Sequence, residues 1–328
     1  MSHQSQLLLL DKHQVESLLT LEATLDAVRE AFLIHSDGTG RLFGLVRESL
    51  AGGNIFGIKS GDVAPLGLLG FKAAGFWASN RAQGSEPHQA TILLFDPETG
   101  RPRCVIDGNL VTTYRTGAAG GLGLQLLARR DSTNLCVFGT GVQARIQTRY
   151  ALALVPELRH IRYVSAKGHA DPLFEAEISA TSATSGCVVS HAKDGDEAVA
   201  ASDIVITATP ARAPLFSADA IQPGTHLNCV GADTAGKREL PHGVLSRAKL
   251  FVDDDRQARE IGEAQWAKET PAIQLGDLLS GKATFQRQPA DITVFDMTGI
   301  ALQDLTVARR LLQGAETTGI GNRIDWPW

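Results

Sequence analysis

The chain has little cysteine, few aromatic residues and no excess of positive charge. Its 328 residues include four cysteines and 6% aromatic residues, and the formal net charge is −5. The cysteines are far apart and form no CxxC pair, which argues against a disulfide framework or a cysteine zinc site and is typical of reduced thiols in the cytosol. The acidic balance argues against a general nucleic-acid-binding protein. We therefore expect a cytoplasmic protein with no metal site and no nucleic-acid partner.

Long apolar runs, repeats and low-complexity segments are also missing. No apolar run approaches the roughly 18 residues that a membrane-spanning helix needs. Residues 1–10 lack the basic start and the long apolar segment of a signal peptide. The chain is 43% hydrophobic and 20% charged, which is ordinary for a globular protein that buries a core. At roughly 100–200 residues per domain, the length allows one large domain or two.

The first third of the chain predicts a helix followed by a largely antiparallel sheet. Thr20 can cap a helix whose apolar residues recur at helical spacing and which ends at Gly38. Residues 41–106 are then short apolar runs separated by glycines and turns, which is typical of antiparallel strands. The clearest strands are 68–72, 90–95 and 104–106.

From about residue 113 the pattern changes to alternating strands and helices. A helix over 115–129 precedes a strand at 135–138, and a second helix runs to about 154. Alternation of this kind over roughly 140 residues indicates a doubly wound parallel sheet. Further strands are expected at 160–165, 188–189, 203–208, 227–230, 250–252 and 292–295. A last amphipathic helix is expected over 299–314.

A glycine-rich motif lies between the first of these strands and the following helix. It reads Gly139-x-Gly141-x-x-Ala144. The first glycine permits the tight turn, the second lets the backbone approach a pyrophosphate, and the small third residue permits close packing of helix on strand. Phosphate oxygens then meet free amides at the helix N-terminus. The alternative is a glycine-rich turn with no ligand.

The end of the next strand bears on the choice of nicotinamide cofactor. An NAD enzyme usually offers Asp or Glu about 20 residues after the glycines, where it binds the ribose hydroxyls. Residues 158–170 contain no acid, and Ser165 and Lys167 occupy the expected place, with Arg162 and His169 nearby. A hydroxyl and a cation suit a 2′-phosphate, so the sequence favours NADP(H) over NAD(H). Alternatively, Lys167 is a solvated loop lysine.

Many ordered segments resemble those of the ornithine cyclodeaminase/μ-crystallin family over nearly the whole chain. They are 70–72, 94–100, 107–116, 127–132, 139–144, 207–210, 230–240, 252–254 and 298–304. The family includes cyclodeaminases, alanine and arginine dehydrogenases, and reductases of cyclic ketimines. The resemblance therefore implies an α/β fold with a Rossmann-type doubly wound nucleotide domain and a mixed α+β substrate and dimerisation domain.

The resemblance also implies domain limits and partners. Residues 1–112 with 296–328 would form the substrate-binding and dimerisation domain, and residues 113–295 the dinucleotide-binding domain. Composition changes near Thr112 and Asp291 agree with this division. The expected partners are a small amino or imino acid and a second copy of the chain, with no membrane contact.

Basic residues and one aspartate carry over from the family's site. Arg47, Lys72 and Arg115 match its substrate-carboxylate ligands, which fits the bidentate binding of carboxylates by guanidinium groups. Arg47 alone could equally be a surface arginine, whereas Lys72 lies in an apolar run where an unpaired ammonium is costly. Asp233 matches the catalytic aspartate, with Lys72 as a second catalytic group. The alternative for Asp233 is a turn or capping role.

The cofactor contacts combine the glycine-rich turn, the end of the second strand and the resemblance. From the turn and the strand come Gly139, Thr140, Gly141, Val142, Gln143, Ser165 and Lys167. From the resemblance come Arg115, Thr116, Thr209, Val230, Gly231, Lys237 and Thr298.

Some positions depart from the family's usual pattern, mainly on the substrate side. Residues 59–61 read Lys-Ser-Gly where Met-Pro-Ala is common, Pro87 replaces a threonine, and Met297 stands where serine is common. The run 117–121 is unusually rich in glycine. These departures leave the substrate open.

The sequence thus predicts an NAD(P)H-dependent oxidoreductase that interconverts an α-imino or α-keto acid and an L-amino acid. The preferred substrate is a cyclic ketimine, Δ1-pyrroline-2-carboxylate or Δ1-piperideine-2-carboxylate. One alternative is an open-chain dehydrogenase of arginine or alanine. Another is an ornithine cyclodeaminase, a lyase in which NAD+ is recycled. A third is a cofactor-binding protein without activity, against which the presence of Lys72, Arg115 and Asp233 argues.

Overall fold

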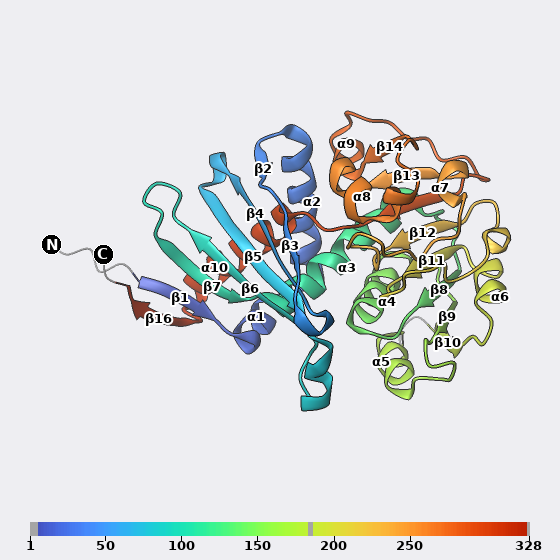
Figure 1. Cartoon of the computed structure of the whole chain (residues 1–328), viewed down its shortest axis with the longest axis horizontal. Helices are drawn as coiled ribbons and strands as arrows, with labels where there is room; N and C mark the ends of the chain where they lie inside the picture. Colours follow the sequence, from blue (N-terminus) through green and yellow to red (C-terminus); the bar gives the residue numbers. More distant parts are fainter. Residues whose placement is uncertain (1–5, 183–185, 327–328) are drawn as a thin grey trace. The chain divides into compact units, whose positions relative to one another are not determined.

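The structure is a computed structural model that describes residues 6–182 and 186–326. The first five residues of the N-terminal stretch considered above lie outside this range. The chain divides into two compact units, Met1–Arg115 with Ile300–Trp328 (unit 1) and Thr116–Gly299 (unit 2) (Figure 1). Among the described residues, no helix combines the length and apolarity needed to cross a bilayer.

Unit 1 contains a sheet in which eight strands are described, in the order β16-β1-β7-β6-β5-β4-β2, with β3 also paired to β4. All neighbours are antiparallel except β1 and β7, which are parallel. The predicted antiparallel sheet is therefore confirmed, although the two outer strands β1 and β16 were missed. The strands are β1 (Gln6–Leu10), β2 (Gly40–Leu42), β3 (Val46–Ser49), β4 (Ile55–Val63), β5 (Leu68–Phe76), β6 (His88–Phe95), β7 (Pro102–Asp107) and β16 (Asn322–Asp325).

Helices α1 (Lys12–Leu18), α2 (Leu21–Asp37) and α10 (Ala301–Thr318) accompany this sheet. Thr20 caps α2 as predicted, since its side chain accepts a hydrogen bond from the N–H of Ala23 at 3.1 Å. Helix α10 packs on α2, β4 and β5 and buries Leu302, Leu305 and Leu312, as its apolar spacing predicts. Helix α1 was not predicted, because its signal is a capping box between Asp11 and Gln14 rather than an apolar stripe.

Unit 2 contains a parallel sheet in the order β10-β9-β8-β11-β12-β15-β13-β14. Every pairing of its described strands is parallel, which confirms the predicted doubly wound sheet. The chain winds from β8 outward through β9 and β10, then returns to start β11 on the other side of β8. The strands are β8 (Asn134–Phe138), β9 (His160–Val164), β10 (Val188–His191), β11 (Ile204–Thr207), β12 (His226–Cys229), β13 (Lys249–Val252), β14 (Ala272–Gln274) and β15 (Thr293–Asp296).

Seven α-helices run through or lie within the described part of unit 2. They are α3 (Gly108–Leu127), α4 (Val142–Leu154), α5 (Pro172–Ser182), α6 (Gly195–Ala200), α7 (Val244–Arg247), α8 (Asp255–Ile261) and α9 (Leu275–Ser280). Helix α3 crosses the boundary from unit 1. It begins seven residues before the predicted start at Arg115, because the side chain of Asp107 accepts hydrogen bonds from the N–H groups of Asn109 and Leu110.

The glycine-rich run in α3 is explained by packing within unit 2. A Cβ atom on Gly117 would lie 2.6 Å from the ring of Tyr150, and one on Gly120 would overlap the side chain of Gln147. Both partners belong to α4. The glycines therefore let α3 and α4 approach closely, and the run need not reflect the substrate.

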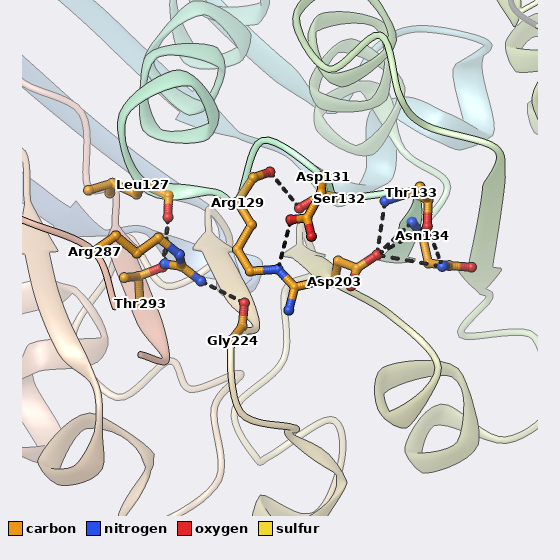
Figure 2. A network of polar contacts seen from close by, with 10 residues as sticks. All are labelled: Leu127, Arg129, Asp131, Ser132, Thr133, Asn134, Asp203, Gly224, Arg287 and Thr293. Carbon is orange, nitrogen blue, oxygen red and sulfur yellow. Dashed lines mark hydrogen bonds and ion pairs between the residues drawn. The ribbon is translucent and has the colours of Figure 1, made fainter. Parts of the chain in front are cut away.

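A polar network joins the amino ends of the parallel strands. In Figure 2, Asp203 accepts a hydrogen bond from Arg129 at 2.8 Å and others from the N–H groups of Thr133 and Asn134. Nearby, Arg287 donates to the carbonyls of Leu127 and Gly224 and to the Thr293 hydroxyl, each at 2.6 Å. Because β8 and β15 begin here, this network stabilises the end of the sheet away from the carboxyl ends of the strands.

Candidate active site

The strand order of unit 2 reverses between β8 and β11. In open parallel sheets, ligands bind beyond the carboxyl ends of the strands at such a switch point. The residues that follow β8 are the glycine-rich turn, and those that follow β11 include Thr209. The topology therefore brings two predicted cofactor segments to the same edge of the sheet.

The glycine-rich turn has the geometry of a phosphate-binding loop. Gly139 has a φ of 104°, and a Cβ there would lie 2.7 Å from the carbonyl oxygen of Ala208, so only glycine fits. A Cβ on Gly141 would meet nothing within 4 Å, so the backbone borders open space at this point. Gly141 is the N-cap of α4, and no side chain caps the helix. Ala144 is fully buried beneath the turn. The loop thus offers helix amides to an anion.

The four polar residues that the sequence analysis placed near the end of β9 have different surroundings in the structure. Arg162 donates to the side chain of Asn134 at 3.0 Å, and the His169 ring contacts the carbonyl of Ala170. These two side chains are engaged elsewhere. Ser165 is buried, and its hydroxyl accepts a hydrogen bond from the backbone N–H of Lys167. Lys167 itself is exposed.

The first acidic residue after β9 is Asp171, and its carboxylate already has partners within the protein. Its carboxylate accepts a hydrogen bond from the N–H of Phe174 at 3.0 Å and lies 3.8 Å from Arg145. The backbone hydrogen bond from Phe174 is the main cause that lowers the pKa of Asp171, with smaller contributions from Thr140 and Arg145. Asp171 therefore caps α5 rather than standing open for a ribose.

Glu239 joins the loops that follow β11 and β12. It is fully buried, and its carboxylate accepts hydrogen bonds from the Thr207 hydroxyl, from the N–H and hydroxyl of Thr209, and from the N–H of Gly231, all within 2.8 Å. Burial raises the pKa of Glu239, and these hydrogen bonds oppose that rise. The sequence analysis gave Glu239 no role, because its partners lie 8 to 32 residues away.

Two further buried carboxyl groups lie next to these loops, and each accepts a backbone hydrogen bond. Glu263, in the 3-10 helix η5 (Glu263–Trp266), accepts a hydrogen bond from the N–H of Glu239 at 2.6 Å. Asp296 accepts one from the N–H of Ala264 at 2.9 Å. Burial raises the pKa of Glu263 to about 7 and raises that of Asp296 well above its usual value.

Asp233 and Lys237 form an ion pair just after β12. The distance from Lys237 Nζ to Asp233 Oδ1 is 2.6 Å, and Lys237 also donates to the carbonyl of Gly231 at 3.1 Å. The Asp233 side chain is 39% exposed, so a ligand can reach it. Lys237 thus pairs with Asp233, and its predicted contact with the cofactor stays a prediction.

Thr298 is held in place by two polar side chains of unit 2. Its hydroxyl donates to Asp253 at 2.8 Å and accepts a hydrogen bond from Gln257 at 2.6 Å. Asp253 also accepts a hydrogen bond from the N–H of Gly299. The segment after β15 is therefore rigidly anchored.

Unit 1 contains a buried cluster built on Lys72. Lys72 Nζ lies 2.7 Å from Asp304 Oδ1, and Arg115 Nε lies 3.2 Å from the same oxygen. Arg115 also donates through Nη1 to Gln303 at 3.1 Å. These four side chains belong to residues at most 8% exposed. Lys72 and Arg115, predicted together from the sequence, are thus brought together, whereas Asp304 and Gln303 were not predicted.

Two other basic residues lie on neighbouring strands of unit 1. Lys59 of β4 is directly opposite Lys72 of β5, and its charge is one cause that lowers the pKa of Lys72. Arg47 lies on β3 opposite Gly57, and its role in substrate binding stays a prediction. Among the described residues, no group of three His, Cys, Asp or Glu could hold a metal ion.

Comparison with known families matches residues 5–318 to the ornithine cyclodeaminase/mu-crystallin family. The chain belongs to this family. The match spans both units, so it confirms the predicted family, and the fold class is confirmed with it.

Three proteins that are similar to this chain are named for three different substrates. The iminosuccinate reductase of Paracoccus denitrificans is 31% identical over 326 residues, which cover 97% of this chain and all of the relative. The structure of an archaeal alanine dehydrogenase dimer with bound NAD matches with a TM-score of 0.89 and 28% identity, covering 98% of this chain and 99% of that one. The Δ1-pyrroline-2-carboxylate reductase of Thermococcus litoralis, in complex with NADH and L-proline, matches with a TM-score of 0.87 and 25% identity, covering 97% and 100%.

These relatives are named as reductases and dehydrogenases, which confirms the predicted enzyme class of an oxidoreductase. Their named substrates differ from one another. The comparisons therefore support the class of reaction more strongly than any one substrate.

Proposed function

We propose that this protein is an NAD(P)H-dependent oxidoreductase that interconverts an α-imino or α-keto acid and an L-amino acid. Its preferred substrate in this proposal is a cyclic ketimine, Δ1-pyrroline-2-carboxylate or Δ1-piperideine-2-carboxylate. The observation that carries the proposal is the buried pair of cations, Lys72 and Arg115, that share one oxygen of Asp304. Every α-imino acid has a carboxylate, and buried guanidinium and ammonium donors are suited to bind it.

Unit 2 supplies the groups for the nucleotide and the proton. The nicotinamide, when bound, supplies or accepts the hydride. Reduction of a C=N bond also needs a proton on the nitrogen, and Asp233 is the proposed group that holds it. The 2.6 Å contact with Lys237 orients this carboxylate. Glu239, which binds the backbone N–H groups of Thr209 and Gly231, keeps the surrounding loops in place.

NADP(H) is the proposed nucleotide, with NAD(H) as an alternative. Lys167 and Ser165 follow β9, and the first acid after this strand, Asp171, caps α5. A cation and a hydroxyl suit a 2′-phosphate better than a carboxylate does. All three relatives described above have structures with NAD+ or NADH, so the preference for NADP(H) rests on the residues of this chain alone.

We further propose a homodimer in the cytoplasm. The archaeal alanine dehydrogenase relative is a dimer. All four cysteines are free and buried, which suits a reducing compartment.

The test is a substrate panel with both cofactors. Purified protein is assayed by NAD(P)H absorbance with Δ1-pyrroline-2-carboxylate, Δ1-piperideine-2-carboxylate, and pyruvate or 2-ketoarginine with ammonia. The reverse direction uses L-proline, L-arginine and L-alanine. The proposal predicts the highest kcat/KM for a cyclic ketimine, and a higher value for alanine or arginine would replace it with an open-chain dehydrogenase. The Asp233→Asn variant serves as the control, and we expect it to lose turnover and keep cofactor affinity within a few-fold.

A further inference from the structure

Asp304 lies at the centre of the buried cluster of unit 1, although the sequence analysis gave it no role. It belongs to the first turn of α10, far along the chain from Lys72 on β5 and from Arg115 on α3. Its residue is 1% exposed, and one carboxylate oxygen contacts both cations. Three elements distant in sequence therefore meet at a single carboxylate.

The surroundings of Lys72 disfavour its charged form, and the carboxylate of Asp304 opposes this effect. The pKa of Lys72 is lowered to about 7, with burial as the largest cause and the charges of Arg115 and Lys59 acting in the same direction. Asp304 is the group that opposes them, through its charge and its hydrogen bond. The two cations in turn hold the pKa of Asp304 below its usual value, against the effect of burial.

The geometry also fixes the direction of the guanidinium group. Gln303, the preceding residue of α10, accepts a hydrogen bond from Arg115 Nη1 at 3.1 Å, and Asp304 Oδ1 lies 3.2 Å from Arg115 Nε in an ion pair that lacks hydrogen-bond geometry. The hydrogen bond and the ion pair together hold the guanidinium group in place. The first turn of α10 thus orients Arg115, while the same turn holds the ammonium of Lys72.

Three polar atoms in the cluster have unused hydrogen-bonding capacity. Arg115 Nε, Gln303 Nε2 and Asp304 Oδ2 are buried and make no hydrogen bond with the described residues. Buried polar atoms in native proteins are rarely left in this state. A ligand carboxylate in this place would accept hydrogen bonds from Arg115 Nε and Gln303 Nε2, whereas Asp304 Oδ2 can only accept and needs a donor.

Stability alone is a weak reason for such a cluster. Replacing a buried ion pair by well-packed apolar residues is often neutral or stabilising. A cluster of four buried polar side chains is therefore better explained by a ligand that needs them.

We propose that Asp304 is the positioning residue of the substrate site, which holds Lys72 and orients Arg115 so that both donate to one substrate carboxylate. This inference rests on the proposed function. It assigns to Asp304 a role that acts through the side chains of Lys72 and Arg115. Asp304 itself, being an anion, does not bind the carboxylate.

The test compares Asp304→Asn, Asp304→Glu and the wild-type protein. Steady-state kinetics with Δ1-pyrroline-2-carboxylate are measured from pH 6 to 9, and the binding of pyrrole-2-carboxylate, a planar unreactive analogue, is measured by calorimetry. We expect Asp304→Asn to raise KM and the analogue's Kd by about tenfold or more, as the loss of one charge-assisted contact implies. The fall of kcat/KM at alkaline pH should also move to lower pH, because Lys72 loses its counter-charge.

Asp304→Glu keeps the charge and moves it by one methylene, so it tests the geometry even where Asp304→Asn fails to fold. We expect it to raise KM while leaving the alkaline fall near its wild-type pH. A merely structural role would lower stability and leave this pH unchanged in both variants.

Glu30→Gln is the matched control for the position of α10. Glu30 on α2 pairs with Arg309 on α10 at 2.6 Å, so this change removes an ion pair of α10 without touching Lys72 or Arg115. Its KM and pH profile should equal those of the wild-type protein. Equal values for Asp304→Asn as well would overturn the proposal.

The outcomes separate this inference from the proposed function. If the wild-type protein reduces no imino acid but Asp304→Asn still weakens analogue binding, the proposed function fails and the role of Asp304 stands. If the wild-type protein turns over imino acids and Asp304→Asn and Asp304→Glu leave KM and the pH profile unchanged, only the role of Asp304 fails. A wild-type protein that neither binds the analogue nor reduces an imino acid overturns both.

Discussion

Lys59 of β4 and Lys72 of β5 lie directly opposite each other in an antiparallel pair. Side chains in such a pair point to the same face of the sheet, and like charges there repel. The charge of Lys59 is indeed one cause that lowers the pKa of Lys72 to about 7. Lys59 therefore makes the charge of Lys72 more sensitive to pH.

The Lys59→Met variant should therefore raise the pKa of Lys72. Since substrate carboxylate binding needs the charged ammonium, kcat/KM falls as the pH rises through this pKa. We expect the fall to move upward by about 0.5 pH unit in the variant, as the removal of one nearby like charge implies. A pH profile of kcat/KM checks this. The same change at the exposed Lys12, a residue of α1, is the control, and a profile unmoved by Lys59→Met would contradict the electrostatic account.

Glu239 offers a test of the nucleotide site that does not touch the substrate cations. In Glu239→Gln, one of the two carboxylate oxygens becomes an NH2 group and can no longer accept from the loop N–H or hydroxyl groups of Thr207, Thr209 or Gly231. We expect the Kd for NADPH, measured by fluorescence titration, to rise about tenfold, in line with a lost hydrogen bond to a charged group.

The matched control for this change is Glu260→Gln, on the exposed face of α8. It should bind NADPH with wild-type affinity. Wild-type affinity in Glu239→Gln too would mean that these loops do not shape the nucleotide site.

Lys167 tests the preference for NADP(H). In Lys167→Asp, a carboxylate replaces the cation after β9, so it repels a 2′-phosphate and can accept from ribose hydroxyls. The ratio of kcat/KM for NADPH to that for NADH should fall at least about tenfold. Lys249→Asp, at the amino end of β13, should leave the ratio unchanged. An unchanged ratio in Lys167→Asp would show that Lys167 is a solvated loop lysine.

Glu263 predicts how stability depends on pH. Its pKa rises from 4.5 in the unfolded chain to about 7 in the fold, so between these values the folded protein binds more protons than the unfolded one. The contribution of Glu263 to the free energy of unfolding is therefore present below pH 4.5 and is lost as the pH rises through 7.

Glu263→Gln should remove this dependence. Relative to the wild-type protein, its free energy of unfolding should increase between pH 4.5 and 7, by about 3 kcal/mol. Urea denaturation at several pH values measures it, with Glu260→Gln as the exposed control. A constant difference across this range would mean that Glu263 stays ionised in the fold.

Local patterns carried most of the fold prediction. The parallel sheet of unit 2 was visible because buried strands and glycine-rich turns have signals within a few residues, as in β8 and the Gly139–Ala144 turn. Strands β1, β14 and β16 were missed, since each is short and is stabilised by partners far along the chain.

The candidate site was predictable to the extent that its residues carry family motifs. Lys72 and Arg115 were predicted together, and the structure brings them to one carboxylate. That carboxylate, Asp304, lies in the family segment 298–304, but its partner Lys72 is 232 residues away, so the segment alone did not show what Asp304 contacts. Glu239 was missed for the same reason, because only the folded chain shows which N–H groups it binds.

The measurement that tests the central claim most directly is the stoichiometry of the cofactor. Purified protein is mixed with Δ1-pyrroline-2-carboxylate and NADPH, and with L-ornithine and a trace of NAD+, and proline, ammonia and reduced cofactor are quantified. The account predicts one NADPH oxidised for each proline formed from the imino acid, and no proline from ornithine. Proline and ammonia formed from ornithine in excess of the NAD+ supplied, with no net change in the cofactor, would contradict it and identify a cyclodeaminase.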